Sequence, residues 1–346
     1  MKNKTLLSII MLALLVSACA QAGPVELNVM THDSFAVSES VIQAFEKEHN
    51  VKVNFILSGD AGSALNQAIL TKSAPLADIF YGIDNTFLSR GLNAGIFEPY
   101  QSPMLDAIPD EFQLDKTYQV LPIDFGDVCI NYDKAFFTRN QLPIPQKLDD
   151  LLQPQYRGLL VVQNPAVSSP GLSFLLATVA NFGDPGYLDF WRQLRTNKVV
   201  VVNDWETAYY TNFSGSSGKG SQPMVVSYIT SPAAEVIFAT SKLDESPTAS
   251  LVGENMCFQQ IEFAGILKGT EKLPLARKFV DFLLSRTFQD DIPLKMFMFP
   301  VIPNAALPVE FEKYIQLPTK PSGLAPELIA ANLDNWIDQW RKTVLE

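Results

Sequence analysis

From Val25 onward the sequence alternates between strand-like and helix-like patterns, and this alternation limits the chain to few fold classes. Residues 25–29 and 51–55 alternate apolar and polar side chains, whereas residues 41–45 place apolar side chains at helical spacing. The pattern continues with a helix, a strand and a helix expected at residues 63–72, 78–81 and 86–94. This βαβαβ order predicts an α/β fold with a parallel sheet and right-handed crossovers.

A second set of patterns follows in the rest of the chain. We expect strands at residues 128–132, 158–162, 198–202, 224–228 and 258–267. We expect helices at residues 148–152, 172–181, 275–284 and 324–345. The last two helices carry apolar stripes, including Trp336 and Trp340, which favour core packing over a functional role. Residues 214–221, rich in serine and glycine, predict a flexible loop.

The division of the chain into lobes follows from what the sequence lacks. No linker rich in proline or charge divides its 346 residues, which are enough for two domains. We therefore expect two α/β lobes between which the chain passes more than once. The first lobe comprises residues 24–125 and 258–302, and the second comprises residues 126–257 and 303–346. Such an arrangement leaves a cleft.

The composition excludes several function classes. With 26 Lys and Arg against 37 Asp and Glu, the chain has a net charge of −11 and no basic stretch, so no nucleic-acid partner is expected. Two histidines and three cysteines, without a Cys-x-x-Cys cluster, provide little material for a metal site. Neither a Gly-x-Ser-x-Gly nucleophile motif nor a glycine-rich dinucleotide motif occurs. The sequence favours a binding protein without cofactor or metal over an enzyme.

The N-terminus predicts export. Residues 1–18 form a signal peptide, in which two lysines precede an apolar run at residues 6–16 that is too short to span a bilayer. The Ser-Ala-Cys that ends at Cys19 resembles a bacterial lipobox, which implies cleavage before Cys19 and lipid attachment to its thiol. The alternative is an ordinary signal cut near Ala20 or Ala22. We expect a periplasmic or cell-surface protein whose membrane anchor, if the lipobox is used, is this lipid.

Two cysteines remain in the folded part of the chain, Cys129 and Cys257, each in an apolar, strand-like run. Two buried free thiols are one interpretation. Because an exported protein folds in an oxidising compartment, a disulfide between them is the other.

Carboxylates and aromatic side chains gather where expected strands end. Ligands of parallel sheets bind outside the carboxyl ends of the strands, which places residues 31–34, 58–61 and 82–85 at a candidate site. The carboxylates near such ends are Asp33, Asp60, Asp84 and Asp124. The aromatic side chains in comparable places of the second lobe are Trp205, Tyr209, Tyr210 and Tyr228. Any one of them alone fits a helix cap or a packed ring, but together they suit a flat, cationic ligand.

Eight short segments give the sequence a more specific resemblance. In chain order they are T-H-D-S-F (31–35), Y-G-I-D-N (81–85), D-F-G (124–126), Y-D-K (132–134), S-S-P-G-L (168–172), W-E-T-A-Y (205–209), S-Y-I-T-S-P-A (227–233) and F-M-F-P-V (297–301). In this order the chain resembles the thiamine-binding periplasmic proteins of ABC importers. The resemblance implies a two-lobed type II periplasmic binding protein fold, with a hinge and an interlobe cleft that holds thiamine or its phosphates. It also implies an ABC permease as partner, and we expect a monomer.

The resemblance also implies roles for individual residues. Trp205 and Tyr228 would face the thiamine rings, Asp60 would bond the aminopyrimidine, and Ser168 or Ser169 would meet the hydroxyethyl or phosphate end. The sequence departs from the family pattern at His32, Ala234 and Phe297, where large aromatic side chains are usual. The complete expected ligand-binding set is His32, Asp33, Ser34, Asp60, Asp84, Asp124, Ser168, Ser169, Trp205, Tyr209, Tyr228 and Phe297.

A ferric-ion-binding protein of the same fold is the alternative prediction. That related family holds iron with adjacent tyrosines, a histidine and a carboxylate, which Tyr209, Tyr210, His32 and Asp60 resemble. Against it, Trp205 and the segment at residues 227–233 have no role in an iron site. Thiamine or a close analogue is therefore the preferred ligand.

Overall fold

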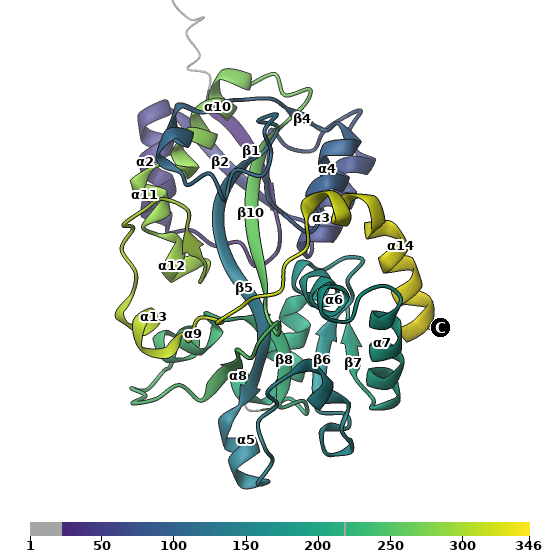
Figure 1. Ribbon diagram of the computed structural model, residues 1–346. Coiled ribbons are helices and arrows are strands. Elements are labelled where there is room, and N and C mark those ends of the chain that lie inside the picture. The colour runs from purple at the N-terminus through teal and green to yellow at the C-terminus, as the bar shows by residue number, and fades with distance from the viewer. Residues whose placement is uncertain (1–22, 218) are drawn as a thin grey trace, which may run out of the picture.

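The computed structural model describes residues 23–217 and 219–346. The signal peptide at residues 1–18 and the lipidation at Cys19 lie outside the described residues. Two long strands, β5 (Leu121–Asp133) and β10 (Phe258–Leu267), run down the middle of the molecule and connect an upper and a lower lobe (Figure 1). None of the helices in the described part of the chain combines the length and apolar character needed to span a bilayer.

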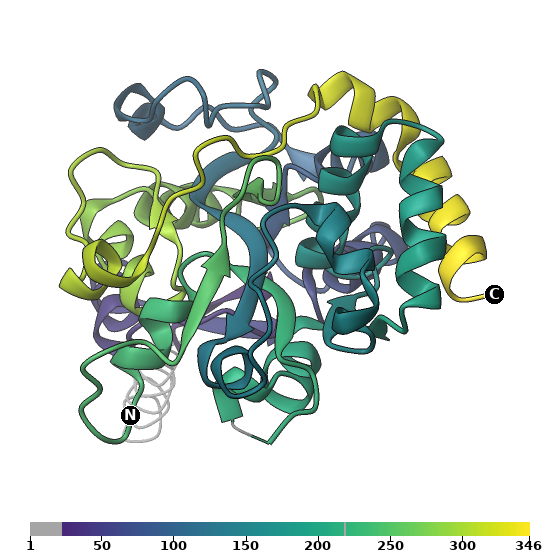
Figure 2. The same cartoon turned by 60° about the horizontal axis from the view of Figure 1, so that its bottom comes forward.

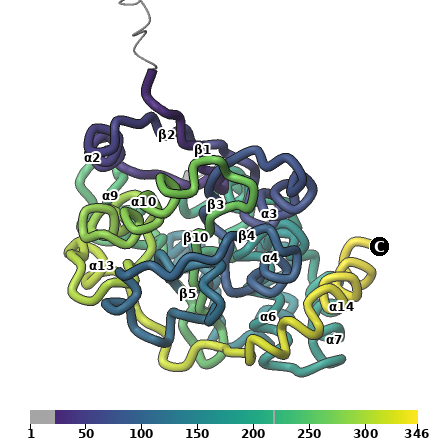
Figure 3. The backbone as a smooth tube through the Cα atoms, turned by 90° about the horizontal axis from the view of Figure 1, so that it is seen from above, coloured from purple at the N-terminus to yellow at the C-terminus, as the bar shows by residue number. Residues whose placement is uncertain are grey.

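The upper lobe confirms the predicted βαβαβ unit. Strand β1 (Val25–Thr31) pairs in parallel with β2 (Val51–Leu57) and with β3 (Ile79–Asp84). The helices of this lobe are α2 (Glu39–His49), α3 (Ala61–Leu70), α4 (Leu88–Ala94) and α10 (Leu273–Leu283). Figure 3 shows α2 and α10 on one side of the strands and α3 and α4 on the other. Because both faces are covered, β3 is buried along its whole length.

Strands β5 and β10 make the sheet continuous between the lobes. They pair antiparallel, with Phe258 opposite Val128 and Ala264 opposite Leu121. Strand β10 also pairs with β3, and the far half of β5 pairs with β8 (Met224–Tyr228). The sheet order is β2-β1-β3-β10-β5-β8-β6-β7. The molecule is therefore a two-lobed, mixed α/β structure, as the sequence predicts.

The lower lobe repeats the parallel arrangement. Strand β6 (Leu160–Gln163) pairs in parallel with β7 (Val200–Val202) and with β8. Its helices include α6 (Ser169–Phe182) and α7 (Gly186–Thr196). Helix α14 (Pro326–Val344) lies beside α7 (Figure 2) and also contacts α4 of the upper lobe. Trp336 and Trp340 of α14 are buried, which confirms their predicted core role.

Shorter elements complete the described chain, and one of them corrects a prediction. The strands are β4 (Phe97–Glu98), β9 (Thr248–Leu251) and β11 (Phe299–Pro300). The helices are α5 (Lys134–Arg139), α8 (Ser214–Ser217), α9 (Ser231–Ile237), α11 (Arg286–Gln289), α12 (Ile292–Lys295) and α13 (Val309–Tyr314). The prediction of a loop at residues 214–221 is wrong for α8. The Ser214 hydroxyl donates to Asp133, 2.6 Å away, which holds the start of this turn against β5.

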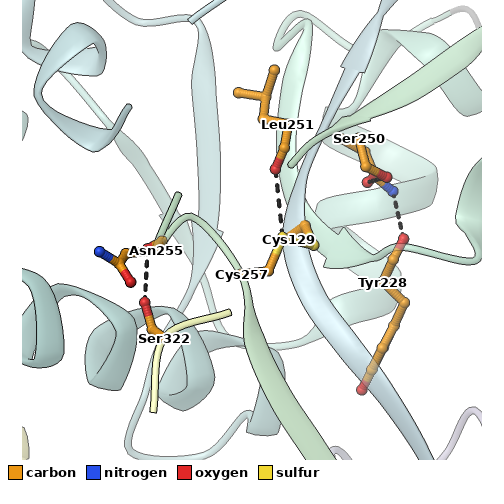
Figure 4. Close-up of a disulfide and its surroundings, with 8 residues drawn as sticks. Cys129, Tyr228, Ser250, Leu251, Asn255, Cys257 and Ser322 are labelled. Carbon is orange, nitrogen blue, oxygen red and sulfur yellow. Dashed lines mark hydrogen bonds between the residues drawn. A yellow bond between two sulfur atoms is a disulfide. The ribbon is translucent and has the colours of Figure 1, made fainter. Parts of the chain in front are cut away.

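The two cysteines of the folded chain form a disulfide (Figure 4). Cys129 lies on β5 and Cys257 directly precedes β10, and both side chains are buried. The bond therefore fastens the start of one crossing strand to the middle of the other. Because its partners are 128 residues apart in sequence, the chain-entropy argument assigns such a cross-link roughly 4–5 kcal/mol.

Candidate functional site

A cavity of about 450 Å³ lies where loops from both lobes meet. It is lined by the loop after β1, the N-termini of α3 and α6, the segment after β7, helix α9, strand β10 and the chain around α12. These loops follow the carboxyl ends of parallel strands, where α/β sheets bind ligands. Of the twelve predicted site residues, nine line it: His32, Asp33, Ser34, Asp60, Ser169, Trp205, Tyr209, Tyr228 and Phe297.

Part of the cavity lining is an aromatic wall, formed by Trp205, Tyr209, Tyr210 and Tyr228. The rings of Trp205 and Tyr209 are nearly parallel, with centroids 5.0 Å apart and an interplanar angle of 19°. Tyr210 meets Trp205 edge-on at 5.5 Å, and Tyr228 lies 6.4 Å from it. A π-helical turn at Thr207–Asn212 follows Trp205 and carries both of the adjacent tyrosines. This turn brings three rings from one short segment into contact.

Hydrogen bonds fix the orientation of the aromatic wall. The indole Nε1 of Trp205 donates to the Ser227 hydroxyl at 2.9 Å, and the hydroxyl of Tyr209 donates to Glu235 at 2.6 Å. Burial, together with the charge of Glu235, raises the pKa of Tyr209 well above its usual range. Tyr209 is therefore a protonated phenol that already has an acceptor.

Another part of the lining is an acidic wall, formed by His32, Asp33, Asp60 and Glu262. Asp33 follows β1 and accepts from the backbone N–H of Gly59 at 2.8 Å. Asp60 precedes α3; its two oxygens accept from the N–H of Ala61 at 2.8 Å and of Trp205 at 3.2 Å. The bond to Trp205 joins the two walls. Burial raises the pKa of Asp60, although these donors and the charge of His32 oppose the shift.

His32 and Glu262 form the deepest part of the acidic wall. His32 is 8% exposed and Glu262 is 4% exposed. The His32 Nε2 atom lies 3.7 Å from a carboxylate oxygen of Glu262. Burial disfavours the charged imidazole, but the carboxylates of Glu262, Asp60 and Asp33 outweigh it and raise the pKa of His32.

Three predicted site residues do not line the cavity. Asp84 lies behind it on β3 and accepts from the hydroxyl of Ser169 and the N–H of Thr86. Burial raises the pKa of Asp84 to about 6. Asp124, on β5, accepts from the hydroxyl of Tyr81 at 2.5 Å. Ser168 precedes α6 and is fully buried. Through these bonds Asp84 holds Ser169 and Asp124 holds Tyr81 from behind the cavity.

The mouth of the cavity carries an aromatic pair, of which the sequence predicts Phe297 but not Phe238. Phe238, which ends α9, lies with its ring 4.8 Å from that of Phe297. Ala234, where the resemblance leads one to expect an aromatic side chain, lies one turn earlier on the same helix and also lines the cavity. Phe238 therefore supplies a ring close to the position that Ala234 leaves small. Phe297 holds a left-handed backbone, with φ of 54°, which bulky residues rarely adopt.

Sequence reasoning also missed Glu262. It is the one charged residue in the ten-residue apolar strand β10, and a carboxylate in such a strand is a signal that could have identified it. No cluster of three or more His, Cys, Asp or Glu side chains suited to a metal ion occurs within the described residues.

Comparisons with known proteins find relatives over nearly the whole chain. The family described as "Bacterial extracellular solute-binding protein" matches residues 74–320. A thiamine-binding periplasmic protein from Brucella abortus biovar 1 (strain 9-941) is 32% identical over 348 residues, covering 98% of each chain. A solved structure titled "Periplasmic thiamin binding protein" has a TM-score of 0.80 and 28% identity, covering 92% of this chain and 96% of that chain.

The fold extends to iron carriers at lower identity. A ferric-binding protein from Campylobacter jejuni has a TM-score of 0.73 and 18% identity, covering 92% of this chain and 99% of that chain. At this identity the likeness concerns the fold alone.

Proposed function

Since the chain belongs to the family of bacterial extracellular solute-binding proteins, we propose that it captures thiamine, free or as a phosphate ester, and delivers it to an ABC permease. The family places it among the solute-binding proteins of ABC transport, which act outside the cytoplasm and are not enzymes. The choice of thiamine is the proposal, and it concerns the chemistry of the cavity.

One observation carries the proposal: the lining of a single cavity combines a wall of rings with a wall of carboxylates. Thiamine has two flat rings, and its thiazolium ring carries a permanent positive charge. A cation over a ring face contributes about 0.5–2 kcal/mol per contact, whereas nanomolar binding requires about 12 kcal/mol. Stacking on Trp205 and Tyr228, ring contact with Phe297 and a charge-assisted bond to the acidic wall supply the kinds of contact needed.

We propose the remaining roles on the same basis. Ser169 and Ser34 line the cavity and offer hydroxyls to the hydroxyethyl or phosphate end of the ligand. Asp33 and Asp60 face the aminopyrimidine. Asp84 and Asp124 contribute indirectly, by holding Ser169 and Tyr81 in place. Ser168, buried at the start of α6, lies beside Asp60.

Binding in this proposal is a hinged closure of a monomer. The lobes, residues 24–125 with 258–302 and residues 126–257 with 303–346, move about the crossing strands β5 and β10. Ligand favours the closed form because it then contacts both walls, and the permease reads that form. The Asp60–Trp205 hydrogen bond and the Phe238–Phe297 contact both join the two lobes so defined.

The anchor is a separate part of the proposal. The Ser-Ala-Cys that ends at Cys19 fits a site of lipid attachment, and a lipid on the Cys19 thiol would hold the protein at the membrane. Mass spectrometry of the mature N-terminus from a native membrane fraction tests it: a diacylglyceryl group on Cys19 supports the anchor. A mature chain that begins after Ala20 or Ala22 without lipid contradicts it.

Calorimetry tests the choice of ligand. The purified protein, freed of co-purified ligand by unfolding and refolding, is titrated with thiamine, thiamine monophosphate, thiamine diphosphate and ferric citrate. We expect one site with a submicromolar Kd for at least one thiamine compound and no heat from iron. A red, iron-loaded protein that ignores all thiamine compounds would establish the ferric alternative instead.

A further inference from the structure

Three carboxylates lie side by side across neighbouring strands behind and within the acidic wall. Glu262 of β10 is directly opposite Asp84 of β3 on one side and Asp124 of β5 on the other. All three are buried. Residues in register share one face of a sheet, and like charges in such positions repel. The fold therefore holds an arrangement that is unfavourable unless donors or a cation compensate it.

Compensation differs among the three carboxylates. Asp84 accepts from Thr86 and Ser169, and Asp124 accepts from Tyr81. Glu262 receives one long bond, 3.3 Å from the amide of Gln260. Its second oxygen, Oε2, has no hydrogen-bond partner among the described residues. Glu262 is thus the member of the row that lines the cavity and still lacks a partner.

His32 is positioned to offset this charge without bonding to it. At 3.7 Å, its Nε2 atom is beyond hydrogen-bond distance from Glu262, and within residues 23–217 and 219–346 it has no partner. Gly82 makes this approach possible, because a Cβ there would lie 2.5 Å from the imidazole. The position accepts a ring close to the sheet, with its Nε2 atom buried beside Glu262.

The groups that face the His32–Glu262 pair are acidic or neutral. They are Asp33 in the same loop, Asp60 before α3, Tyr81 and Asp84 on β3, Asp124 on β5 and Tyr228 on β8. Of the described residues that line the cavity, the other basic one is Lys295 on α12, whose side chain is exposed. Burial and the charge of Glu262 raise the pKa of Asp124 well above its usual range, so Asp124 holds a proton and the charge of the row is reduced. Of the described groups that face Glu262, His32 is the one that can carry a positive charge.

We propose that Glu262 is the counter-charge for the ligand's positive charge. While the cavity is empty, a protonated His32 balances the charge of Glu262 instead. This inference rests on the proposed function, since it assigns the positive charge to the thiazolium of thiamine. On binding, the thiazolium takes the position next to Glu262, repels the charged imidazole, and the His32 proton passes to bulk buffer. No covalent bond other than that N–H changes. The pair thereby selects cationic over neutral ligands.

Proton release makes binding depend on pH. The pKa of His32 is raised above its ordinary 6.5, chiefly because the carboxylate of Glu262 outweighs burial. Below that pKa each binding event expels close to one proton, so the affinity for thiamine rises with pH, by up to about tenfold per unit. Above it the dependence disappears. A neutral ligand expels no proton and shows no such dependence.

Calorimetry in two buffers of different ionisation enthalpy, such as phosphate and imidazole, measures this release directly. At pH 6.5 we expect more than about half a proton released per thiamine bound to the unchanged protein, and none for H32Q. With E262Q we expect thiamine binding to weaken by about tenfold or more. Binding of thiochrome, a neutral fused derivative of thiamine, should change less than about twofold in E262Q.

The matched control is D127N. Asp127 is a buried carboxylate on β5, like Asp124, but it does not line the cavity, so its substitution should leave both ligands and the proton count unchanged. Circular dichroism and thermal melting establish that each variant is folded. If E262Q does not fold, H32Q alone still tests the proton.

The outcomes separate this inference from the proposed function. If thiamine binds with heat that is independent of buffer, or if H32Q still releases the proton, the His32 assignment is overturned while thiamine binding stands. If E262Q weakens thiamine and thiochrome equally, Glu262 does not select charge. If the unchanged protein gives no heat with any thiamine compound, the proposed function fails, and this inference fails with it.

Discussion

The two walls of the cavity are built in different ways. The aromatic wall is complete in itself: Trp205 and Tyr209 stack on each other, and their polar atoms already have acceptors in Ser227 and Glu235. The acidic wall is incomplete: His32 Nε2 and Glu262 Oε2 are buried without hydrogen-bond partners among the described residues. A preorganised wall gives affinity to any flat ligand, whereas an uncompensated one favours a ligand that brings positive charge.

The largest effect on binding is expected from W205A. This change removes the central ring of the aromatic wall and its hydrogen bond to Ser227. We expect thiamine binding to weaken by at least about tenfold, which corresponds to about 1.4 kcal/mol. The comparison of the two walls adds a sharper requirement. Thiochrome should lose affinity by a similar factor, because stacking on the Trp205 ring does not require the ligand to be charged. Calorimetry with both ligands measures the two factors.

A matched change outside the cavity controls for general loosening of the lobe. Phe182 and Phe190 form a stacked pair on α6 and α7, with centroids 4.8 Å apart, and neither lines the cavity. F182A should leave both affinities within about twofold. If W205A binds thiamine with unchanged affinity, Trp205 does not contact the ligand. The role assigned to the aromatic wall is then wrong.

A smaller effect is expected at the mouth, where the walls approach each other. F238A removes a ring that contacts Phe297 of the other lobe and is otherwise 66% exposed. Aromatic pairs contribute about 0.5–1.5 kcal/mol, so thiamine should dissociate about 2–10 times faster. Because the proposed closure would form this contact after the ligand has entered, the association rate should change little. Stopped-flow fluorescence of the tryptophans measures both rates.

L317A serves as its control, since Leu317 is a similarly exposed apolar residue that does not line the cavity. Equal dissociation rates for F238A and the unchanged protein would show that the Phe238–Phe297 contact does not retain the ligand. The mouth would then be an open rim rather than a closing contact.

The fold was readable from the sequence because its signals are local. The alternation of residues 25–29 and the helical spacing of residues 41–45 depend on each element facing one core, so β1, α2 and β2 appear where predicted. The loop prediction at residues 214–217 failed because a distant partner, Asp133, holds the turn. A composition rich in serine and glycine indicates a flexible chain, but it does not predict a contact with a distant residue.

The two walls differ in the same respect. Three members of the aromatic wall lie within residues 205–210, so a short segment was enough to predict them. The acidic wall joins β10 to the loops after β1 and β2, and Glu262 was missed because it lies inside an apolar strand rather than at a strand end. Asp84 and Asp124 were predicted to bind the ligand, but strand register, which the sequence does not show, puts them behind the cavity.

The smallest effect on binding, and a measurable one on stability, is expected from D127N. Asp127 is 6% exposed, and its Oδ1 atom is buried without a hydrogen-bond partner in the described chain. Burial raises the pKa of Asp127 to about 6, against about 3.9 in an unfolded chain. The native state therefore holds this proton more tightly, so the free energy of unfolding contributed by Asp127 falls as pH rises from about 4 to about 6.

Asparagine carries no charge at any of these pH values, so D127N removes that loss. Relative to the unchanged protein, we expect D127N to be more stable at pH 8 by about 1–3 kcal/mol and nearly equal at pH 4. Urea unfolding at the two pH values measures the difference, and thiamine affinity should stay the same. A gain that is equal at both pH values would mean that packing, not ionisation, separates aspartate from asparagine there. A loss of thiamine affinity would mean that Asp127, which lies outside the cavity, also attracts the ligand. The acidic wall would then not differ in this respect from the other buried carboxylates.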